Sequence, residues 1–258
     1  MNKLIQQAVN NSTGLSVIII TKNEAHNIRA CLESVKWADE IIVVDSGSTD
    51  ETAAICREFT PLVYEHDWPG FGAQKNRALG YATKEWVLSL DADERVTPGL
   101  RAQLADAMSD ARHDGFYLPR LSQFCGTFIR HSGWYPDYVL RLFKKSQARF
   151  SDDMVHERVM LQGHAGRLSS PLLHYSYRDA ADVQRKVELY ATAAAKQMFR
   201  SGKTATRMDA PLRAGWAFFR TYCLRLGFLD GAAGFNIARM NAGTTYLKYE
   251  KLKTMQSA

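Results

Sequence analysis

Three short, almost entirely apolar runs constrain the fold of this chain most strongly. They occupy residues 15–20, 40–45 and 86–90, and each ends in or runs into polar residues. Runs of this length that are rich in β-branched side chains are typical of strands covered on both faces. Between the first two, Ile28, Leu32 and Val35 have the spacing of a buried helical stripe. Alternating strands and helices predict a parallel sheet with right-handed crossovers, so we expect residues 15–110 to form a doubly wound α/β unit.

Polar residues gather where the predicted strands end. Thr21 and Asn23 follow the first run, Asp45 closes the second, and Asp91 and Asp93 follow the third. In an open α/β sheet, ligands bind beyond the carboxyl ends of the strands. We therefore expect these five side chains to converge on one binding site.

The Asp91-Ala92-Asp93 sequence indicates what that site could bind. On an extended strand, residues i and i+2 point the same way. A divalent cation holding a diphosphate would offset the charge of two carboxylates, and the alternative is an acidic loop without a ligand. Lys75 and Arg77 lie upstream on a predicted helix. They could hold diphosphate oxygens or could be ordinary exposed helix charges.

Local signals predict where three helices begin. Thr97 followed by Pro98 is typical of a helix cap with Pro at the first helical position. Ser48, with Glu51 three residues later, matches a capping box. Asp179 can cap a long helix that extends to about Arg200.

Several enzyme classes and locations are disfavoured by what the sequence lacks. It has no phosphate-binding P-loop, no dinucleotide-binding glycine motif after the first strand and no hydrolase nucleophile elbow. Its four cysteines are widely scattered, which argues against a disulfide framework or a structural zinc site and fits a reducing compartment. Residues 1–14 lack the apolar run of a signal peptide, and no run approaches the ~20 apolar residues of a spanning helix. We expect a cytoplasmic protein.

Positive charge is concentrated near the C-terminus. The net charge is +6, and residues 180–258 contain 13 Lys and Arg but 5 Asp and Glu. A basic segment predicts an acidic partner such as phospholipid, nucleic acid or a phosphorylated substrate. The sequence pattern divides the chain into an arm (1–14), an α/β domain (15–178) that changes pattern at about residue 110, and a basic helical extension (179–258).

One stripe in this extension allows two interpretations. Leu212, Trp216, Phe219, Cys223 and Leu226 recur at helical spacing, with arginines off the stripe. The helix could pack on the body of the protein through this stripe. It could instead lie in a membrane interface, with its apolar face in the lipid and its arginines near anionic head groups.

Three motifs resemble a known family. Residues 18–24 (IIITKNE), 43–50 (VVDSGSTD) and 90–94 (LDADE) are similar, in order and spacing, to the family-2 glycosyltransferases. That resemblance implies an inverting enzyme with a glycosyltransferase A-type (GT-A) fold: a Rossmann-like mixed, mainly parallel sheet flanked by helices, here with a C-terminal helical extension. Residues 15–110 would be its nucleotide-sugar half and 111–178 its acceptor half.

More local motifs narrow the resemblance. Residues 68–77, 134–143 (WYPDYVLRLF), 155–158 (VHER) and 226–231 look like the bacterial lipopolysaccharide core β-1,4-glucosyltransferases, which act on an inner-core heptose. The resemblance implies UDP-glucose as donor, a lipopolysaccharide inner-core acceptor and Mg²⁺ or Mn²⁺ as cofactor. It also implies work at the cytoplasmic face of the inner membrane, where an anionic membrane surface would be a partner.

The resemblance also assigns roles to individual residues. One group would bind the uridine end of the nucleotide sugar: Thr21, Asn23, Glu24, Asp45 and Ser46. Asp91 and Asp93 would serve the ribose, the metal and the diphosphate, with Asp93 as the metal ligand and Asp91 at the ribose or at a water on the metal. Lys75 and Arg77 would approach the phosphates.

The catalytic base is less clearly marked. An inverting transfer needs a carboxylate to take the proton of the attacking acceptor hydroxyl. Many family members carry it in a Glu-Asp pair after the metal motif, and no such pair follows Glu94. Glu157 is the favoured counterpart and Asp137 its rival. His156 could bind metal, orient Glu157 or simply be a packed histidine.

Three other functions remain open. The first is a transferase of the same fold that uses another nucleotide sugar, or a polyprenyl-phosphate or other glycan acceptor. The second is a sugar-phosphate nucleotidyltransferase, although the first strand end lacks the glycine-rich basic loop of such enzymes. The third is a nucleic-acid-binding module, suggested by the basic tail. Nucleic acid is not expected as a partner because the strand-end site is acidic and no single-strand stacking motif is apparent.

Overall fold

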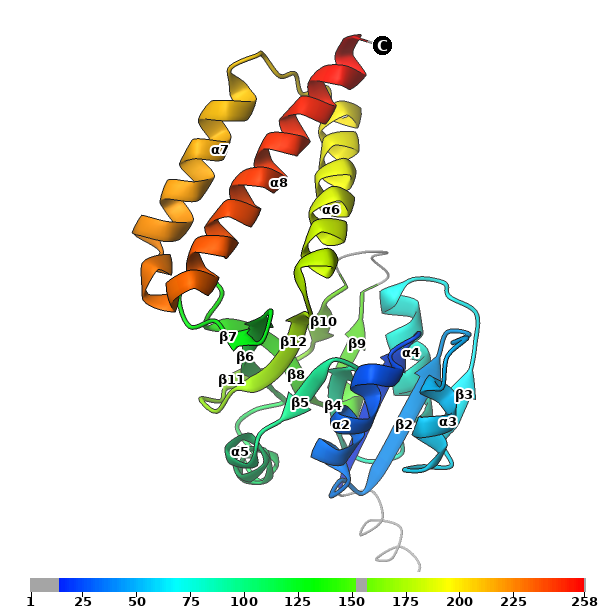
Figure 1. Ribbon diagram of the computed structural model, residues 1–258. Coiled ribbons are helices and arrows are strands. Elements are labelled where there is room, and N and C mark those ends of the chain that lie inside the picture. The colour runs from blue at the N-terminus through cyan, green and yellow to red at the C-terminus, as the bar shows by residue number, and fades with distance from the viewer. Residues whose placement is uncertain (1–13, 152–156, 258) are drawn as a thin grey trace, which may run out of the picture. The chain divides into compact units, whose positions relative to one another are not determined.

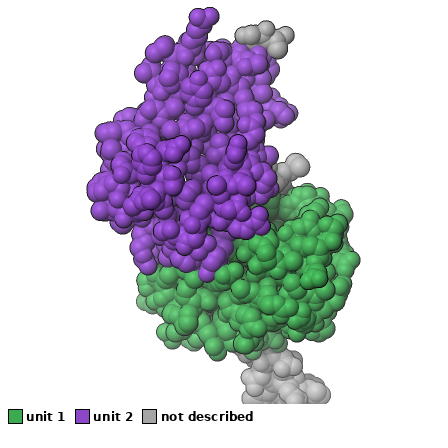
Figure 2. All heavy atoms as spheres, in the orientation of Figure 1, with its two compact units in different colours: residues 1–120, 137–174 green, residues 121–136, 175–258 purple. Residues whose placement is uncertain are grey.

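The computed structural model describes residues 14–151 and 157–257, which form two compact units (Figure 2). Unit 1 comprises Met1–Arg120 and Asp137–His174, and unit 2 comprises Leu121–Pro136 and Tyr175–Ala258. His156 and most of the N-terminal arm lie outside the described residues.

A ten-stranded mixed sheet is the framework of the fold. Its main path has the order β3-β2-β1-β4-β8-β6-β12-β5 (Figure 1). The first four strands of this path run parallel, as the sequence predicted: β3 (Val63–Glu65), β2 (Glu40–Asp45), β1 (Leu15–Thr21) and β4 (Trp86–Asp91). All seven residues of β1 are buried, which confirms a strand covered on both faces.

Beyond β4, the main path of this sheet continues with strands in antiparallel pairs. β8 (Asp137–Lys144) lies between β4 and β6 (Gly115–Phe124) and is antiparallel to both. β12 (Leu172–Tyr177) is antiparallel to β5 (Glu94–Val96). Two short strands also pair with β6: β7 (Thr127–Phe128) is antiparallel to it and β11 (Ala165–Arg167) is parallel to it. A separate two-stranded sheet is formed by β9 (Ala148–Phe150), which follows the short helix η1 (Lys145–Gln147), and β10 (Val159–Leu161).

Helices cover both faces of the parallel strands because alternate strand residues point to opposite sides. Leu15, Val17 and Ile19 pack in a core with α2 (Ala25–Val35), α3 (Thr52–Arg57) and α5 (Pro98–Met108). Ile18 and Ile20 pack on the other face with α4 (Phe71–Tyr81). Two predicted caps are confirmed: Thr97 accepts a hydrogen bond from the N–H of Leu100, and Asp179 accepts one from that of Asp182.

Unit 2 is built on three long helices, α6 (Ala180–Arg200), α7 (Asp209–Phe219) and α8 (Gly231–Ser257). α8 packs against both others and lies between them (Figure 1). α7 is shorter than the stripe predicted, because a π-helical turn, η2 (Arg220–Leu224), and a 3₁₀ turn, η3 (Gly227–Asp230), follow it. Within the described residues, the helices are too short or too polar for any of them to cross a membrane.

Candidate active site

Two loops at the carboxyl ends of the parallel strands are tied together by hydrogen bonds. The Asn23 side-chain oxygen accepts one from the backbone N–H of Thr49 (2.8 Å), and the Ser48 hydroxyl accepts one from the N–H of Asn23 (2.8 Å). Asn23 has φ of +55°, a left-handed conformation that Asn adopts more readily than most residues. The N–H of its neighbour Glu24 donates to the Thr52 hydroxyl (2.8 Å). Asn23 and Glu24 therefore fix the path of the first loop.

The Asp45 carboxylate shapes the second loop. It is buried and accepts hydrogen bonds from the N–H and the hydroxyl of Ser48, at 2.7 and 2.5 Å. Asp side chains commonly close turns in this way. The capping box predicted for Ser48 and Glu51 is therefore wrong. α3 begins at Thr52, whose N–H donates to Asp50 (3.0 Å), while the Ser48 hydroxyl serves Asp45.

Two buried hydroxyl groups lie at the same strand ends. Thr21 is opposite Asp45 in the β1–β2 register, and its Oγ1 has no hydrogen-bond partner among the residues described. The Ser46 hydroxyl accepts a hydrogen bond from the amide of the fully buried Gln74 (2.9 Å). Because an unpaired buried hydroxyl costs free energy, Thr21 is a place where a polar ligand group would be favourable.

Asp91, whose side chain is 32% exposed, lies within a chain of ion pairs that includes three buried side chains. Its Oδ1 is 2.9 Å from the Nζ of Lys75 on α4, and its Oδ2 accepts a hydrogen bond from the Nη2 of Arg141 on β8. The same Nη2 is 2.6 Å from the Oε1 of Glu94. Lys75, Arg141 and Glu94 are 3%, 6% and 0% exposed. Charges this deeply buried depend on their partners, because each would otherwise lose its solvation without compensation.

The charges in this chain set the ionisation of Asp91 and Arg141. Burial alone raises the pKa of the Asp91 carboxyl, but the charges of Arg141 and Lys75 outweigh it and hold that pKa well below its usual range. Burial lowers the pKa of Arg141, and the carboxylates of Asp91 and Glu94 raise it well above its usual value. Both groups are therefore charged at neutral pH.

Each end of this ion-pair chain carries one of the two candidate bases. Glu157 Oε1 is 2.7 Å from the Nζ of Lys75. Arg120 is 3.6 Å from Glu94 through Nη1 and 2.6 Å from Asp137 through Nη2. The Glu157 and Asp137 side chains are 18% and 44% exposed. Carboxylates and cationic side chains alternate along this series of ion pairs. In order, its members are Glu157, Lys75, Asp91, Arg141, Glu94, Arg120 and Asp137.

Asp93 has a different partner from Asp91. The extended geometry that the sequence argument assumed ends at Asp91, because Ala92 and Asp93 form a turn. β5 then pairs with β12 so that Glu94 lies opposite His174. This register brings His174 Nε2 to 3.3 Å from Asp93 Oδ2.

Asp93 and His174 are the residues that fit a metal ion here. In the described ranges, no three Asp, Glu, His or Cys side chains gather in a way that could hold a metal by themselves. Both oxygens of Asp91 already contact cationic side chains. Asp93 and His174 offer one carboxylate and one imidazole, and Mg²⁺-type sites often use only one or two protein ligands together with substrate phosphates. The pair therefore fits a divalent cation whose other ligands would come from a bound ligand.

Arg77 lies outside the ion-pair chain. Its Nη1 donates hydrogen bonds to Asp67 Oδ1 (2.7 Å) and Gln74 Oε1 (3.0 Å). Lys75, in turn, already contacts two carboxylates. Contacts of Lys75 and Arg77 with a diphosphate therefore remain predictions.

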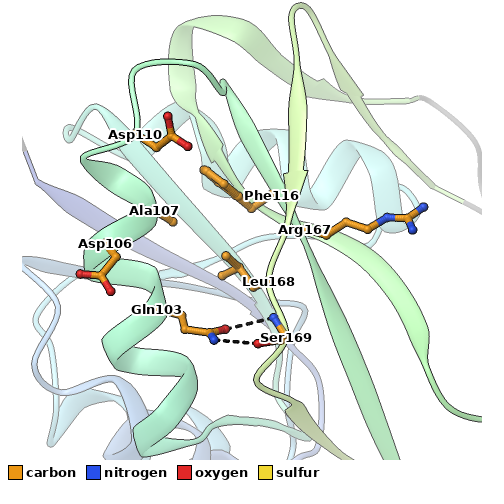
Figure 3. A pocket seen from close by; sticks show the side chains of 8 residues that line it. All are labelled: Gln103, Asp106, Ala107, Asp110, Phe116, Arg167, Leu168 and Ser169. Atoms are coloured by element: carbon orange, nitrogen blue, oxygen red, sulfur yellow. Dashed lines mark hydrogen bonds between the residues drawn. The ribbon is translucent and has the colours of Figure 1, made fainter.

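A separate hollow lies beside the second half of α5 (Figure 3). Gln103 closes one side of it by hydrogen bonds with the hydroxyl and the N–H of Ser169, at 2.8 and 3.0 Å. Asp106, Asp110, Phe116 and other residues complete its lining. Since it shares no residue with the ion-pair chain or the Asp93–His174 pair, it is not part of the strand-end site.

The fold is a mixed, mainly parallel sheet flanked by helices, which is the fold that the resemblance to the GT-A-type glycosyltransferases implied. More particularly, residues 16–165 match the model of glycosyl transferase family 2, and the chain belongs to that family.

Relatives match nearly the whole chain. An uncharacterised glycosyltransferase of Rickettsia felis is 28% identical over 93% of this chain and 89% of its own length. The lipopolysaccharide core biosynthesis glycosyltransferase LpsC of Rhizobium meliloti is 29% identical over 91% of this chain and 93% of its own length. Among solved structures, residues 1–349 of S. aureus TarS are a remote match, with 16% identity, a TM-score of 0.49 and coverage of 95% and 92% of the two chains.

Sequence reasoning found the residues at the strand ends but missed most of their partners. Arg141 and Arg120 lie on β8 and β6, Glu94 follows the Asp91–Asp93 pair, and His174 lies on β12. Arg141 lies within a motif that the sequence argument used only for its resemblance. An Arg in the apolar run of residues 139–143 is the signal that could have identified it, because a buried cation requires carboxylate partners.

Proposed function

We propose that this protein is an inverting glucosyltransferase that transfers glucose from UDP-glucose to an inner-core heptose of lipopolysaccharide. Family membership supports the transferase reaction, and similarity to LpsC over nearly the whole chain supports the choice of acceptor. The local motifs at residues 68–77, 134–143 and 226–231 support the choice of donor. The acceptor would be met at the cytoplasmic face of the inner membrane.

The observation that carries this proposal is the arrangement of charges at the ends of β4 and β5. Asp91 is fixed there by two cations, while Asp93 and His174 stand outside the ion-pair chain. In our proposal, the nucleoside binds over the loops held by Asn23 and Asp45, and the diphosphate extends toward Asp93. A divalent cation held by Asp93 and His174 would neutralise charge on the departing diphosphate.

Glu157 remains the favoured base. It contacts Lys75, which contacts Asp91 at the donor end of the site, so a single side chain separates this carboxylate from the strand end. A carboxylate in that position could accept the proton of the acceptor hydroxyl as it attacks the anomeric carbon. Asp137 lies at the far end of the ion-pair chain and is the rival.

Substituting Glu157 tests this role. We expect Glu157→Gln to lower kcat by about 10²- to 10⁴-fold, the usual contribution of a general base. The affinity for UDP-glucose should change little, since the amide keeps a hydrogen-bond acceptor for Lys75. Glu188→Gln is a matched control, because Glu188 also pairs with a lysine, Lys251. Unchanged turnover in Glu157→Gln, with a steep loss in Asp137→Asn, would transfer the role to Asp137.

The donor and acceptor are tested directly by product analysis. The purified protein is incubated with a panel of UDP- and GDP-sugars and with truncated inner-core oligosaccharides, and NMR identifies the new linkage. We expect transfer from UDP-glucose to heptose with inversion at the anomeric carbon. Transfer of another sugar, or to a polyprenyl phosphate, would support the same-fold alternative. The Rickettsia relative, whose name gives no substrate, is about as similar to this chain in sequence identity (28%) as LpsC is (29%), so the same-fold alternative is tested as well.

A further inference from the structure

The apolar stripe of α7 faces outward from unit 2. Leu212, Trp216 and Phe219 are 65%, 56% and 46% exposed. Cys223, the next residue of the stripe, is exposed on η2. We call these four residues the outer stripe. The rings of Trp216 and Phe219 contact each other, with centroids 5.9 Å apart, so these two residues form one apolar surface at the middle of the stripe.

A different face of α7 packs against α8, and its residues are mostly small. Ala210 is buried, and Ala214 and Ala217 are half-buried. Further along, the Phe218 ring packs on Phe235 of α8 (5.6 Å), and the Thr221 hydroxyl accepts a hydrogen bond from Asn241 (3.1 Å). Helices normally bury their large apolar side chains and expose polar ones. Here Phe218 packs on α8, but the other large apolar side chains of α7, Leu212, Trp216 and Phe219, are exposed, so packing within unit 2 does not explain the outer stripe.

Positive charge lies along one side of the outer stripe. Arg213 is three residues before Trp216, and Arg220 is four residues after it, so both neighbour Trp216 on the helix surface. Both are exposed, although Arg213 also pairs with Asp209 (2.9 Å) and lies over the Tyr249 ring of α8 (4.9 Å). Residues 200–230 contain six Lys and Arg and two acids, Asp209 and Asp230. Asp230 is 5% exposed and holds His131, so it offsets little of this charge at the surface.

We propose that the outer stripe is a docking surface for an anionic phospholipid bilayer, in whose interface α7 lies. An exposed apolar and aromatic stripe flanked by arginines combines the two features that hold a helix in such an interface, apolar burial and attraction to anionic head groups. Phe228 and Leu229 of η3, which follows η2 in the sequence, are also apolar and are 48% and 55% exposed.

A second copy of this chain is a poorer occupant of the outer stripe. A two-fold interface places the same patch of each subunit against itself. Arg213 and Arg220 of one copy would then face the same arginines of the other, with Asp209 as the nearby acid. Anionic head groups complement those charges, whereas a second copy repeats them. The proposal concerns location and does not depend on the transfer reaction.

Vesicle co-sedimentation tests the surface. The full chain is mixed with vesicles of phosphatidylcholine alone or of phosphatidylcholine with phosphatidylglycerol, at low and high salt. We expect binding to the anionic vesicles that weakens as salt rises. The combined substitution Leu212→Ser, Trp216→Ser and Phe219→Ser should weaken that binding by about tenfold or more at either salt concentration. Arg213→Gln with Arg220→Gln should weaken it mainly at low salt.

A matched control lies on α6, on the other side of α8. Leu189, Tyr190 and Phe199 are 59%, 53% and 48% exposed. Changing these three residues to Ser removes a comparable set of exposed apolar side chains and should leave vesicle binding unchanged. Circular dichroism and thermal unfolding establish that each variant is folded. Equal loss of binding in both triple variants, or loss in neither, would overturn the proposal.

A probe on Cys223 gives an independent reading of the same contact. Cys31 and Cys56 are buried and Cys125 is exposed, so Cys125→Ser leaves Cys223 as the accessible thiol of the described residues. A polarity-sensitive fluorophore on Cys223 should shift to the blue with anionic vesicles, and a fluorophore on Cys125 in a Cys223→Ser background should not. If the Cys223 probe shifts instead with protein concentration in the absence of lipid, the outer stripe is a self-association surface and the proposal fails.

Discussion

Arg141 joins parts of the strand-end site that are far apart in the sequence. Its guanidinium contacts both Asp91, the last residue of β4, and Glu94, the first residue of β5. The turn that carries Asp93 lies between these two carboxylates. Arg141 therefore holds the ends of this turn from a third strand, β8. Arg141 is therefore a positioning residue: it contacts Asp91 and Glu94, which precede and follow the turn that carries Asp93.

Replacing Arg141 should destabilise the protein in a pH-dependent way. We expect Arg141→Met to cost about 3–5 kcal/mol at neutral pH, because it takes one of two cations from the buried Glu94 carboxylate and one of two from Asp91. The depressed pKa of Asp91 contributes stability that is present above its unfolded value, about 4, and is lost as pH falls toward the folded value. Arg141→Met removes part of that contribution. Urea unfolding should therefore show a larger loss at pH 7 than at pH 3, and a pH-independent loss would contradict this account.

The Asp93–His174 pair predicts how the protein responds to metal. We expect Asp93→Ala and His174→Ala each to weaken UDP binding in the presence of Mn²⁺ by about tenfold or more, and to change metal-free binding much less. Isothermal titration with and without chelator measures both values. Asp106→Ala, which removes an exposed carboxylate of α5, is the control. If His174→Ala binds UDP with wild-type metal dependence, His174 is not a ligand.

Sequence and structure agree best on residues whose position can be predicted from the strand that contains or precedes them. Thr21, Asp45 and Asp91 all lie at the ends of parallel strands. The sequence predicts these positions because apolar runs mark the strands clearly. Arg141 and His174 could not be placed in the same way. Their partners depend on β8 lying beside β4 and β12 beside β5, and this order is set by packing across the whole sheet. No local pattern in the sequence records it.

The cap of α5 shows how much stability one confirmed local signal can carry. Thr97 Oγ1 accepts a hydrogen bond from the N–H of Leu100 and donates one to the carbonyl of Pro171, both at 3.1 Å. Thr97→Ala should cost about 1–2 kcal/mol of unfolding free energy, since it removes a cap and leaves a carbonyl without its donor. Thr97→Ser keeps the hydroxyl and should cost much less. Urea unfolding compares the two, and equal losses would assign the effect to the methyl group.

α7 shows what periodicity can and cannot predict for an element. The spacing of Leu212, Trp216 and Phe219 correctly indicated that they share one face of a helix. It could not show what covers that face, because large apolar residues obey the same spacing against a protein core and against lipid. The alanines that are buried or half-buried on the other face of α7 give a weak hydrophobic signal. The end of the helix at Phe219 was also missed, since the apolar spacing continues through η2.

At the scale of the whole molecule, the two compact units carry separate properties. The strand-end site, with its ion-pair chain and the Asp93–His174 pair, belongs to unit 1. The outer stripe and the excess of positive charge over residues 180–258 belong to unit 2. A ligand that binds one unit should slow local opening of the backbone in that unit. The segments in which opening slows therefore show which unit the ligand binds.

Hydrogen exchange should separate the two ligands within a single protein. UDP with Mn²⁺ should slow amide exchange in the loops after β1, β2 and β4, because a ligand that binds the folded state lowers the population of locally open forms. Anionic vesicles should slow exchange near the ends of α7 and in η2, where backbone groups are least protected by helical hydrogen bonds. Asp93→Ala should weaken the first effect and keep the second, and the outer-stripe Ser variant should do the reverse. If UDP protects α7 as strongly as it protects the loops of unit 1, the two units are coupled and cannot be treated as independent.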